Sequence, residues 1–458
     1  MPDIHYVCLS DMHLGAQNSL LTNLKTASSD IDHSAPSPLL VKLIDCLNSL
    51  IGLNADQNFK PTLILNGDIL EFALAEDNDA VMCFEGLIDL IVPQDGKGLF
   101  DRIIFNPGNH DHHLWETARE TQYANFLSED PIAKWGSTKI PTPWHVTELF
   151  GFPEKLLSSY FLTSFIRRRS DLKQSKRTIE TAYPNLGLKR DDGKKIVVFH
   201  HGHFTEDMYL LMSTLRTMLF PQNPNLPEDI WGWEEENFAW IDFFWSTLGR
   251  SGDVGKGVGS VYEKLQDDKQ VKILLAHLAA GLADKFKIPL MPGSIEAKLI
   301  DSALGPLVDK IRSLERSKPG VELSDESEKG LWRYMEGPLK RQIKRELKSE
   351  NVPSDVSFVF GHTHKPFEQD MNFDGYPGWV HVYNSGGWVV DTVNRQYLHG
   401  GAVVLIDENL NTATLRMYNE HDSLQEYNVE VSEANHPGDE PGPFFTEIEK
   451  RVGEKREL

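Results

Sequence analysis

The chain has 458 residues, 40% of them hydrophobic, which is enough for a packed core in two or three domains or in one large domain with an insertion. Its 46 basic and 68 acidic residues give a formal charge of −22, which argues against a general nucleic-acid binder, because such proteins normally carry a basic surface. The three cysteines have neither zinc-finger nor redox spacing and favour a reducing compartment. Without a signal-peptide pattern or a run of about 18 apolar residues, we expect a cytoplasmic protein with no transmembrane helix.

Short apolar segments alternate with helical patterns over the first 105 residues. We expect strands at 4–10, 62–65 and 102–105, and helices at 38–53 and 83–91, where apolar residues recur at helical spacing. This alternation of strands and helices predicts a layered α/β sheet. Residues 112–190 show a less regular pattern, and a further strand is expected at 195–199.

From about 204 to 352 the pattern is helical and amphipathic, and we interpret this segment as a helical insertion that caps or flanks a site. Its aromatic residues between 220 and 245 are expected to pack a helical core; the alternative is a pocket for an apolar or nucleobase group. The stretch 271–285 favours a packed helix over contact with a membrane surface. No oligomeric state is predicted.

The strand pattern resumes after the insertion, at 356–360, 379–384, 400–406 and 412–418. The last residues, from 432, contain many charges with Pro and Gly, so we expect a solvated tail. The sequence therefore predicts four parts: core residues 1–203, the insertion 204–352, core residues 353–431 and the tail 432–458.

Five short polar motifs follow predicted strands. They carry Asp, Asn and His side chains, which are the oxygen and nitrogen ligands that borderline divalent metals prefer. Ligands at strand ends are held rigidly, as a metal site requires. Two metals about 3.5–4 Å apart can activate a water molecule and bind a phosphoryl group. The motifs are DMH at 11–13, GD at 67–68, GNHD at 108–111, HHGH at 200–203 and GHTH at 361–364.

The histidine-rich motif contains more histidines than one metal site needs. His200 and His201 are adjacent, so on a strand their side chains point to opposite faces and only one should reach the metals. His203 is a weaker competitor for the ligand position. We expect His112 and His113 at the start of a helix or on the rim of the site.

The ordered set of motifs resembles the calcineurin-like metallophosphoesterase family, whose pattern is DxH, GD, GNH[DE], H and GHxH. The resemblance covers roughly residues 4–115, 195–204 and 356–405. It implies a four-layer α-β-β-α sandwich, to which this chain adds the helical insertion. It also implies two divalent metal ions, with manganese expected first and iron or zinc as alternatives. The implied ligands are Asp11, His13 and His364 for the first metal, Asn109, His201 and His362 for the second, and Asp68 as the bridge between them.

The same resemblance implies roles in the reaction. His110 would protonate the leaving oxygen, and Asp111 beside it would orient the imidazole. Contacts to the substrate are expected from His203 and Asn384.

Residues around the motifs narrow the class of reaction. Protein serine/threonine phosphatases of this family carry phosphate-binding arginines where this chain has Phe72 and Pro107, so we do not expect a protein phosphatase. The segments SDMHLG at 10–15, GDILE at 67–71, FGHTH at 360–364 and YNSGGW at 383–388 look similar to the UDP-2,3-diacylglucosamine pyrophosphatase-like branch.

That likeness implies hydrolysis of a phosphodiester or pyrophosphate bond in a small phosphorylated, nucleotide-linked substrate. A phosphomonoesterase is the alternative, and a non-catalytic binding scaffold with the same fold is less favoured. We expect the insertion to affect substrate preference more than metal binding.

Overall fold

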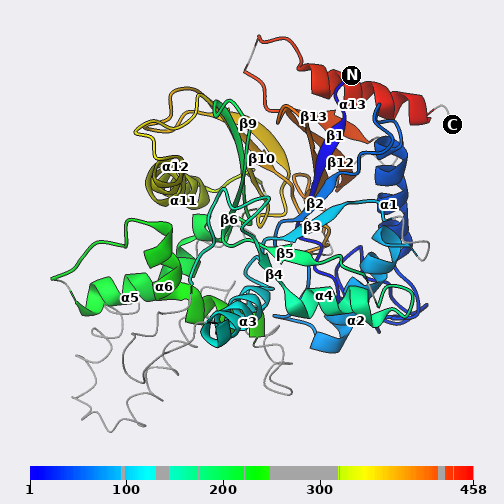
Figure 1. Ribbon diagram of the computed structural model, residues 1–458, viewed down its shortest axis with the longest axis horizontal. Helices are drawn as coiled ribbons and strands as arrows, with labels where there is room; N and C mark the ends of the chain where they lie inside the picture. Colours follow the sequence, from blue (N-terminus) through cyan, green and yellow to red (C-terminus); the bar gives the residue numbers. More distant parts are fainter. Residues whose placement is uncertain are drawn as a thin grey trace, which may run out of the picture.

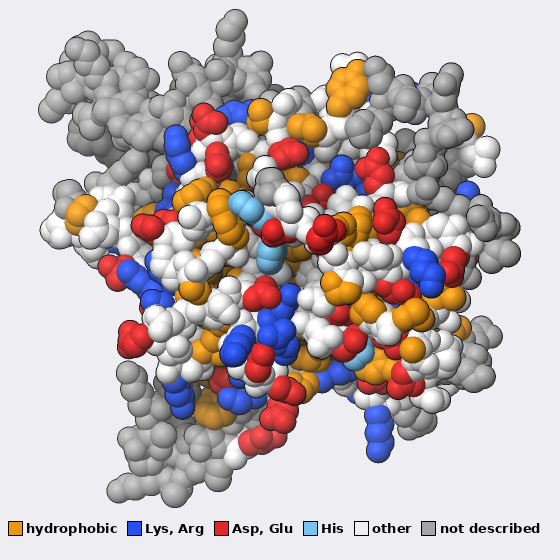
Figure 2. Space-filling model, turned by 90° about the horizontal axis from the view of Figure 1, so that it is seen from above, with side chains coloured by type: hydrophobic (Ala, Val, Ile, Leu, Met, Phe, Trp, Pro, Cys, Tyr) orange, Lys and Arg blue, Asp and Glu red, His pale blue; other side chains and the backbone are white. Residues whose placement is uncertain are grey.

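The computed structural model describes residues 1–93, 98–129, 144–173, 175–220, 222–247, 318, 320–392, 394–420, 429–436 and 438–456. The middle of the expected insertion, including the stretch 271–285, lies outside these residues. Among the described helices, none is long and apolar enough to cross a membrane. On the face shown in Figure 2, acidic and basic side chains are interspersed with apolar ones.

The larger of two sheets has eight strands in the order β13-β12-β11-β1-β2-β3-β5-β4. The neighbours β1, β2, β3 and β5 run parallel, whereas β4 and β11 to β13 are antiparallel to their neighbours. The central strands are buried on both faces, which explains their continuous apolar sequences. The strands are β1 (Ile4–Leu9), β2 (Thr62–Leu65), β3 (Arg102–Phe105), β4 (Leu157–Ser158), β5 (Ile179–Thr181), β11 (Gly400–Asp407), β12 (Thr412–Asn419) and β13 (Glu430–Ser432).

The smaller sheet has five strands in the order β6-β7-β8-β10-β9. Its three central strands, β7, β8 and β10, run parallel, and the two edge strands are antiparallel to them. The strands are β6 (Asn185–Lys189), β7 (Lys195–His200), β8 (Asp355–Phe360), β9 (Phe367–Met371) and β10 (Val380–Asn384).

Three apolar clusters hold the sheets and helices together. The cluster between the sheets joins Cys8 and Ile64 of the larger sheet to Val197 and Val359 of the smaller one. A second cluster packs α1 (Pro38–Ile51), α2 (Asp77–Ile91), α4 (Tyr160–Arg168) and α13 (Pro443–Arg456) on the larger sheet. A third packs α5 (Leu211–Leu219), α6 (Ile230–Trp240), α11 (Asp325–Tyr334) and α12 (Lys340–Leu347) on the smaller sheet, on the other side of the molecule in Figure 1. The fold is therefore α/β, with two mixed sheets flanked by helices.

Most core elements agree with the sequence prediction. The strands β2 and β3 have the predicted bounds, and β1, β7, β8 and β10 differ by a residue or so at one end. Helix α1 begins where predicted, because Ser37 caps it by accepting a hydrogen bond from the Leu40 amide at 3.1 Å. Helix α2 begins six residues before the predicted Cys83, since its first turn is acidic and polar and shows no apolar periodicity.

The described parts of the predicted insertion contain the helices α5, α6, α11 and α12. Trp233 and Trp245 are fully buried in the cluster on the smaller sheet, so these aromatic side chains pack a core, as expected. Trp245 lies in a π-helical segment, Ile241–Thr247, that follows α6.

The prediction of a solvated tail is wrong for residues 443–456, which form α13. Phe444 and Ile448 are buried in the core, and the Arg451 side chain is only 1% exposed. Arg451 donates hydrogen bonds to Asn54 Oδ1 at 2.9 Å and to the Pro2 carbonyl at 3.0 Å. Phe444, Ile448 and Val452 recur at helical spacing, but the many charged residues between them obscured this apolar pattern in the sequence.

Candidate metal centre

The five motifs lie at the carboxyl ends of strands from both sheets. Asp11 follows β1, Asp68 follows β2 and Asn109 follows β3 in the larger sheet, whereas His201 follows β7 and His362 follows β8 in the smaller one. Within each sheet these strands run parallel, so their carboxyl ends meet at one edge. The two edges together hold the predicted metal ligands.

A first group of buried side chains is positioned to hold a metal ion. It consists of Asp11, His13 and His364. His13 Nε2 lies 3.2 Å from His364 Nε2, which in turn lies 3.7 Å from Asp11 Oδ1.

A second buried group contains Asp68, His201 and His362. His201 Nε2 lies at its centre, 3.2 Å from Asp68 Oδ2 and 3.3 Å from His362 Nδ1. Asn109 extends this group, because its carbonyl oxygen lies 3.1 Å from His201 Nε2. The structure thus brings all seven predicted ligands into two adjacent groups.

The Asp68 carboxylate lies between the two groups. Its Oδ1 accepts a hydrogen bond from the His110 amide at 2.8 Å, whereas Oδ2 is buried and accepts none. Oδ2 lies 3.2 Å from His201 Nε2 and 3.9 Å from His13 Nε2 of the first group. Burial alone would raise the pKa of this carboxyl, but the surrounding imidazoles of His201, His110 and His13 hold it well below its usual value. A charged oxygen therefore faces both groups.

Each of the four candidate histidine ligands has its outer ring nitrogen next to an oxygen acceptor. Such acceptors fix the proton on the outer nitrogen and leave a lone pair on the inner one, as for histidines bound to metals. The pairs are His13 Nδ1 with Glu71 Oε2 at 2.7 Å, His201 Nδ1 with the Asn66 carbonyl at 3.3 Å, His362 Nε2 with Glu206 Oε1 at 2.6 Å and His364 Nδ1 with Asp391 Oδ2 at 2.9 Å.

When these imidazoles are neutral and carry their proton on the outer nitrogen, the lone pairs of the inner nitrogens face one another in pairs. The inner nitrogens of His13 and His364 are 3.2 Å apart, and those of His201 and His362 are 3.3 Å apart. Two unprotonated nitrogens at such distances repel each other unless a cation lies between or beside them. The donor set of imidazole, carboxylate and amide oxygen therefore fits divalent metal ions in both groups.

The backbone at the candidate ligands is strained. Among the described residues, eight non-glycine residues have positive φ, and five of them are candidate ligands: Asp11, His13, Asp68, His362 and His364. Strained backbone of this kind clusters at functional sites, where surrounding structure maintains it.

Two motif glycines are required by close packing. A Cβ atom on Gly67 would lie 2.4 Å from the His201 ring, and one on Gly108 would lie 2.3 Å from Asp68 Oδ1. The glycines therefore let the strand ends approach the ligands.

The prediction that Asp111 orients His110 is wrong. The Asp111 carboxylate accepts hydrogen bonds from the backbone amides of Asp68, Ile69, Leu70 and Gly108, and so braces the loops of the GD and GNHD motifs.

Glu71 orients His110 instead. Its Oε1 lies 2.8 Å from His110 Nδ1, and its Oε2 lies 2.7 Å from Nδ1 of the candidate ligand His13. The His110 Nε2 atom is left facing Asp68 Oδ2 at 4.0 Å. Glu71 is the last residue of the motif GDILE, but its residue type alone did not indicate that it bridges two imidazoles.

The reasoning about adjacent histidines is confirmed. His201 reaches the candidate ligands, whereas His200 points to the other face of β7, where its ring lies 4.6 Å from that of Tyr334. His203 belongs to neither group. It is fully buried, and its Nε2 lies 3.3 Å from the Tyr183 hydroxyl.

Asn384, which was predicted to bind substrate, uses its side-chain amide to brace the GHTH loop, and its contact with substrate stays a prediction. The Nδ2 group donates to the Gly361 carbonyl at 3.1 Å and to Thr363 Oγ1 at 2.9 Å, and Oδ1 accepts from the Gly386 amide at 2.8 Å. The residue is fully buried at the end of β10.

Beside the centre lies a buried polar network that the sequence did not reveal. His112 Nε2 lies 2.9 Å from Glu234 Oε1, and its Nδ1 lies 3.3 Å from Asp242 Oδ1. Burial alone would lower the pKa of His112, but these carboxylates raise it to about 10. The Tyr183 hydroxyl donates to Glu234 at 3.0 Å. The network thus joins the start of α3 (His113–Glu129) to α6 and the π-helical segment after it.

Comparisons with protein-family models and with curated proteins find no match for this chain. The candidate metal centre therefore rests on the geometry of its own residues.

Proposed function

We propose that this chain is a metal-dependent phosphoric ester hydrolase with the calcineurin-like four-layer sandwich and two divalent metal ions, manganese first among the candidates. Its reaction is hydrolysis of a phosphodiester or pyrophosphate bond. The observation that carries the proposal is Asp68 Oδ2, a buried carboxylate oxygen without a hydrogen bond, between two groups of metal-binding side chains.

The first metal would be held by Asp11, His13 and His364, and the second by Asn109, His201 and His362, with Asp68 shared. When bound, two such ions supply a hydroxide nucleophile and bind the charge that develops on the phosphoryl oxygens. Every ligand position is filled, which supports an enzyme over a binding scaffold that has lost its ligands.

His110 is the proton donor in this proposal. Its Nδ1 is held by Glu71 at 2.8 Å, and its Nε2 faces the bridging carboxylate at 4.0 Å. Glu71 fixes the orientation of the imidazole, so that Nε2 faces the site and can give its proton to the leaving oxygen. The leaving group departs as a neutral alcohol or as a less charged phosphate.

The test compares a generic aryl phosphodiester with the matching phosphomonoester, using protein loaded with Mn²⁺ and a control treated with a chelator. We expect hydrolysis that the chelator abolishes, with preference for the diester. Preference for the monoester would replace this substrate class with the phosphomonoesterase alternative. No hydrolysis of either ester by fully loaded protein would contradict the proposal and favour a scaffold.

A further inference from the structure

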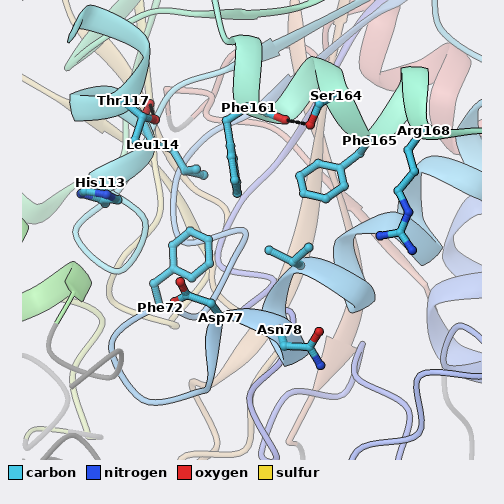
Figure 3. A pocket seen from close by; sticks show the side chains of 11 residues that line it. Phe72, Asp77, Asn78, His113, Leu114, Thr117, Phe161, Ser164, Phe165 and Arg168 are labelled. Carbon is cyan, nitrogen blue, oxygen red and sulfur yellow. Dashed lines mark hydrogen bonds between the residues drawn. The ribbon is translucent and has the colours of Figure 1, made fainter. Parts of the chain in front are cut away.

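A pocket of about 530 Å³ opens between the first turns of α2 and α3 and one face of α4. Its volume lies within the range of roughly 300–1,000 Å³ that is usual for small-molecule sites. In Figure 3, Phe72, Leu114, Phe161 and Phe165 point into the same space from three sides.

The pocket has an apolar interior and a polar rim. Phe72, Leu114 and Phe165 are buried, whereas Phe161 at the mouth is 40% exposed, although it is a large apolar side chain. Arg168 lies at one end of the pocket and pairs with Glu85 at 3.4 Å, so its charge is already balanced. Asp77 in the first turn of α2 adds a negative group to the rim. This lining suits an apolar group and disfavours an anion.

The pocket shares its wall with the candidate metal centre. Phe72 follows Glu71, which contacts both His13 and His110, and the Phe72 amide donates to the His110 carbonyl at 3.3 Å. His113, also in the lining, comes three residues after His110. The apolar wall therefore adjoins the backbone that carries Glu71 and His110.

We propose that this pocket binds an apolar alkyl or aryl group carried by the phosphorylated substrate. The inference rests on the proposed function, because it takes the occupant to be part of the molecule that is hydrolysed. Binding energy from such a remote group positions the reacting bond, so its loss lowers kcat/KM.

A substitution at the exposed Ser164 can fill the pocket without touching the metal centre. Ser164 lies in the lining on α4, and Ser164→Trp would occupy the apolar space, whereas Ser164→Ala leaves it open. The control is Ser128→Trp, which places the same side chain on an exposed position of α3 away from the lining. Thermal unfolding of all variants checks that each one folds.

The first measurement is binding of the apolar fluorophore N-phenyl-1-naphthylamine to metal-free protein, with displacement by octyl phosphate and by methyl phosphate. We expect octyl phosphate to displace the probe far better than methyl phosphate. Ser164→Trp should weaken probe binding at least tenfold, and Ser128→Trp should leave it unchanged. Equal probe binding by the wild type and Ser164→Trp would overturn the proposal.

The second measurement is kcat/KM of the Mn²⁺-loaded protein for a series of 4-nitrophenyl alkyl phosphodiesters, from methyl to octyl. We expect kcat/KM to rise by up to about fourfold per buried methylene in the wild type and to stay flat in Ser164→Trp. A flat series in the wild type would overturn the assignment of the pocket to the substrate. If no ester is hydrolysed although Ser164→Trp blocks the probe, the phosphoesterase proposal fails and the apolar site itself is supported.

Discussion

Replacing Glu206 tests how the segment after β7 supports the second metal group. Glu206 Oε1 lies 2.6 Å from Nε2 of His362, whose other nitrogen faces His201 at 3.3 Å. Both partners are at least 95% buried, so water does not substitute for the carboxylate. Glu206→Gln keeps the shape and an acceptor oxygen but removes the charge, whereas Glu206→Ala removes the acceptor as well.

The expected magnitude follows from the usual effect of such outer partners, which is about 10–100-fold in metal affinity, or roughly 1.4–2.8 kcal/mol. We expect Glu206→Gln near the lower bound and Glu206→Ala near the upper one. The weakened step should be the binding of one of the two metals, since Glu206 is paired with His362 of the second group.

The assay is calorimetric titration of Mn²⁺ into metal-depleted protein, which separates two binding steps of different affinity. Asp207→Asn is the matched control, because it removes one carboxylate charge at the neighbouring residue, which pairs with Arg333 at 2.7 Å. Unchanged Mn²⁺ affinity in Glu206→Ala, or an equal loss in Asp207→Asn, would refute the reasoning.

Three other perturbations have distinct expected outcomes. Asp68→Asn should lose metal affinity together with activity, because the bridging charge is removed; full metal occupancy with normal turnover, measured by elemental analysis and kinetics, would contradict the bridge. His110→Ala should keep both metals and lower kcat by about 10²–10⁴-fold, the usual contribution of general acid–base catalysis; loss of a metal would make His110 a ligand instead. The carboxylate partners of His112 raise its folded-state pKa from 6.5 to about 10, so the protonated imidazole stabilises the wild type fully below pH 6.5 and progressively less as the pH rises toward 10. His112→Asn should therefore lower the free energy of unfolding most below pH 6.5. Denaturant unfolding between pH 6 and 10 measures the difference in unfolding free energy between the wild type and His112→Asn. The control is His113→Asn, at a partly exposed histidine. A difference in free energy that does not depend on pH would contradict the assignment.

The candidate ligands could be predicted from sequence because each motif is local. Asp11, Asp68 and His201 each follow a short apolar strand, so a linear pattern identifies both the strand and the side chain at its end. The alternation of side chains along β7 also distinguished His201 from His200. Packing between the two sheets then brings these strand ends together.

The partners of the ligands could not be predicted in this way. Glu206 and Asp391 lie 156 and 27 residues from the histidines that they contact, in segments without a recognisable motif. The residue type and motif of Asn384 likewise do not show that its side-chain amide braces the GHTH loop. The predicted boundary between core and insertion at residue 204 also assigned Glu206 to the insertion. In the structure, Glu206 contacts the candidate ligand His362.

The most direct test of the central claim is the number of manganese ions that each chain holds, counted by native mass spectrometry after titration of metal-depleted protein with Mn²⁺. Two adjacent groups that share Asp68 predict two ions per chain, and Asp68→Asn should not retain both at the same free Mn²⁺ concentration. Saturation of the wild type at one ion, or no bound ion, would contradict the two-metal centre.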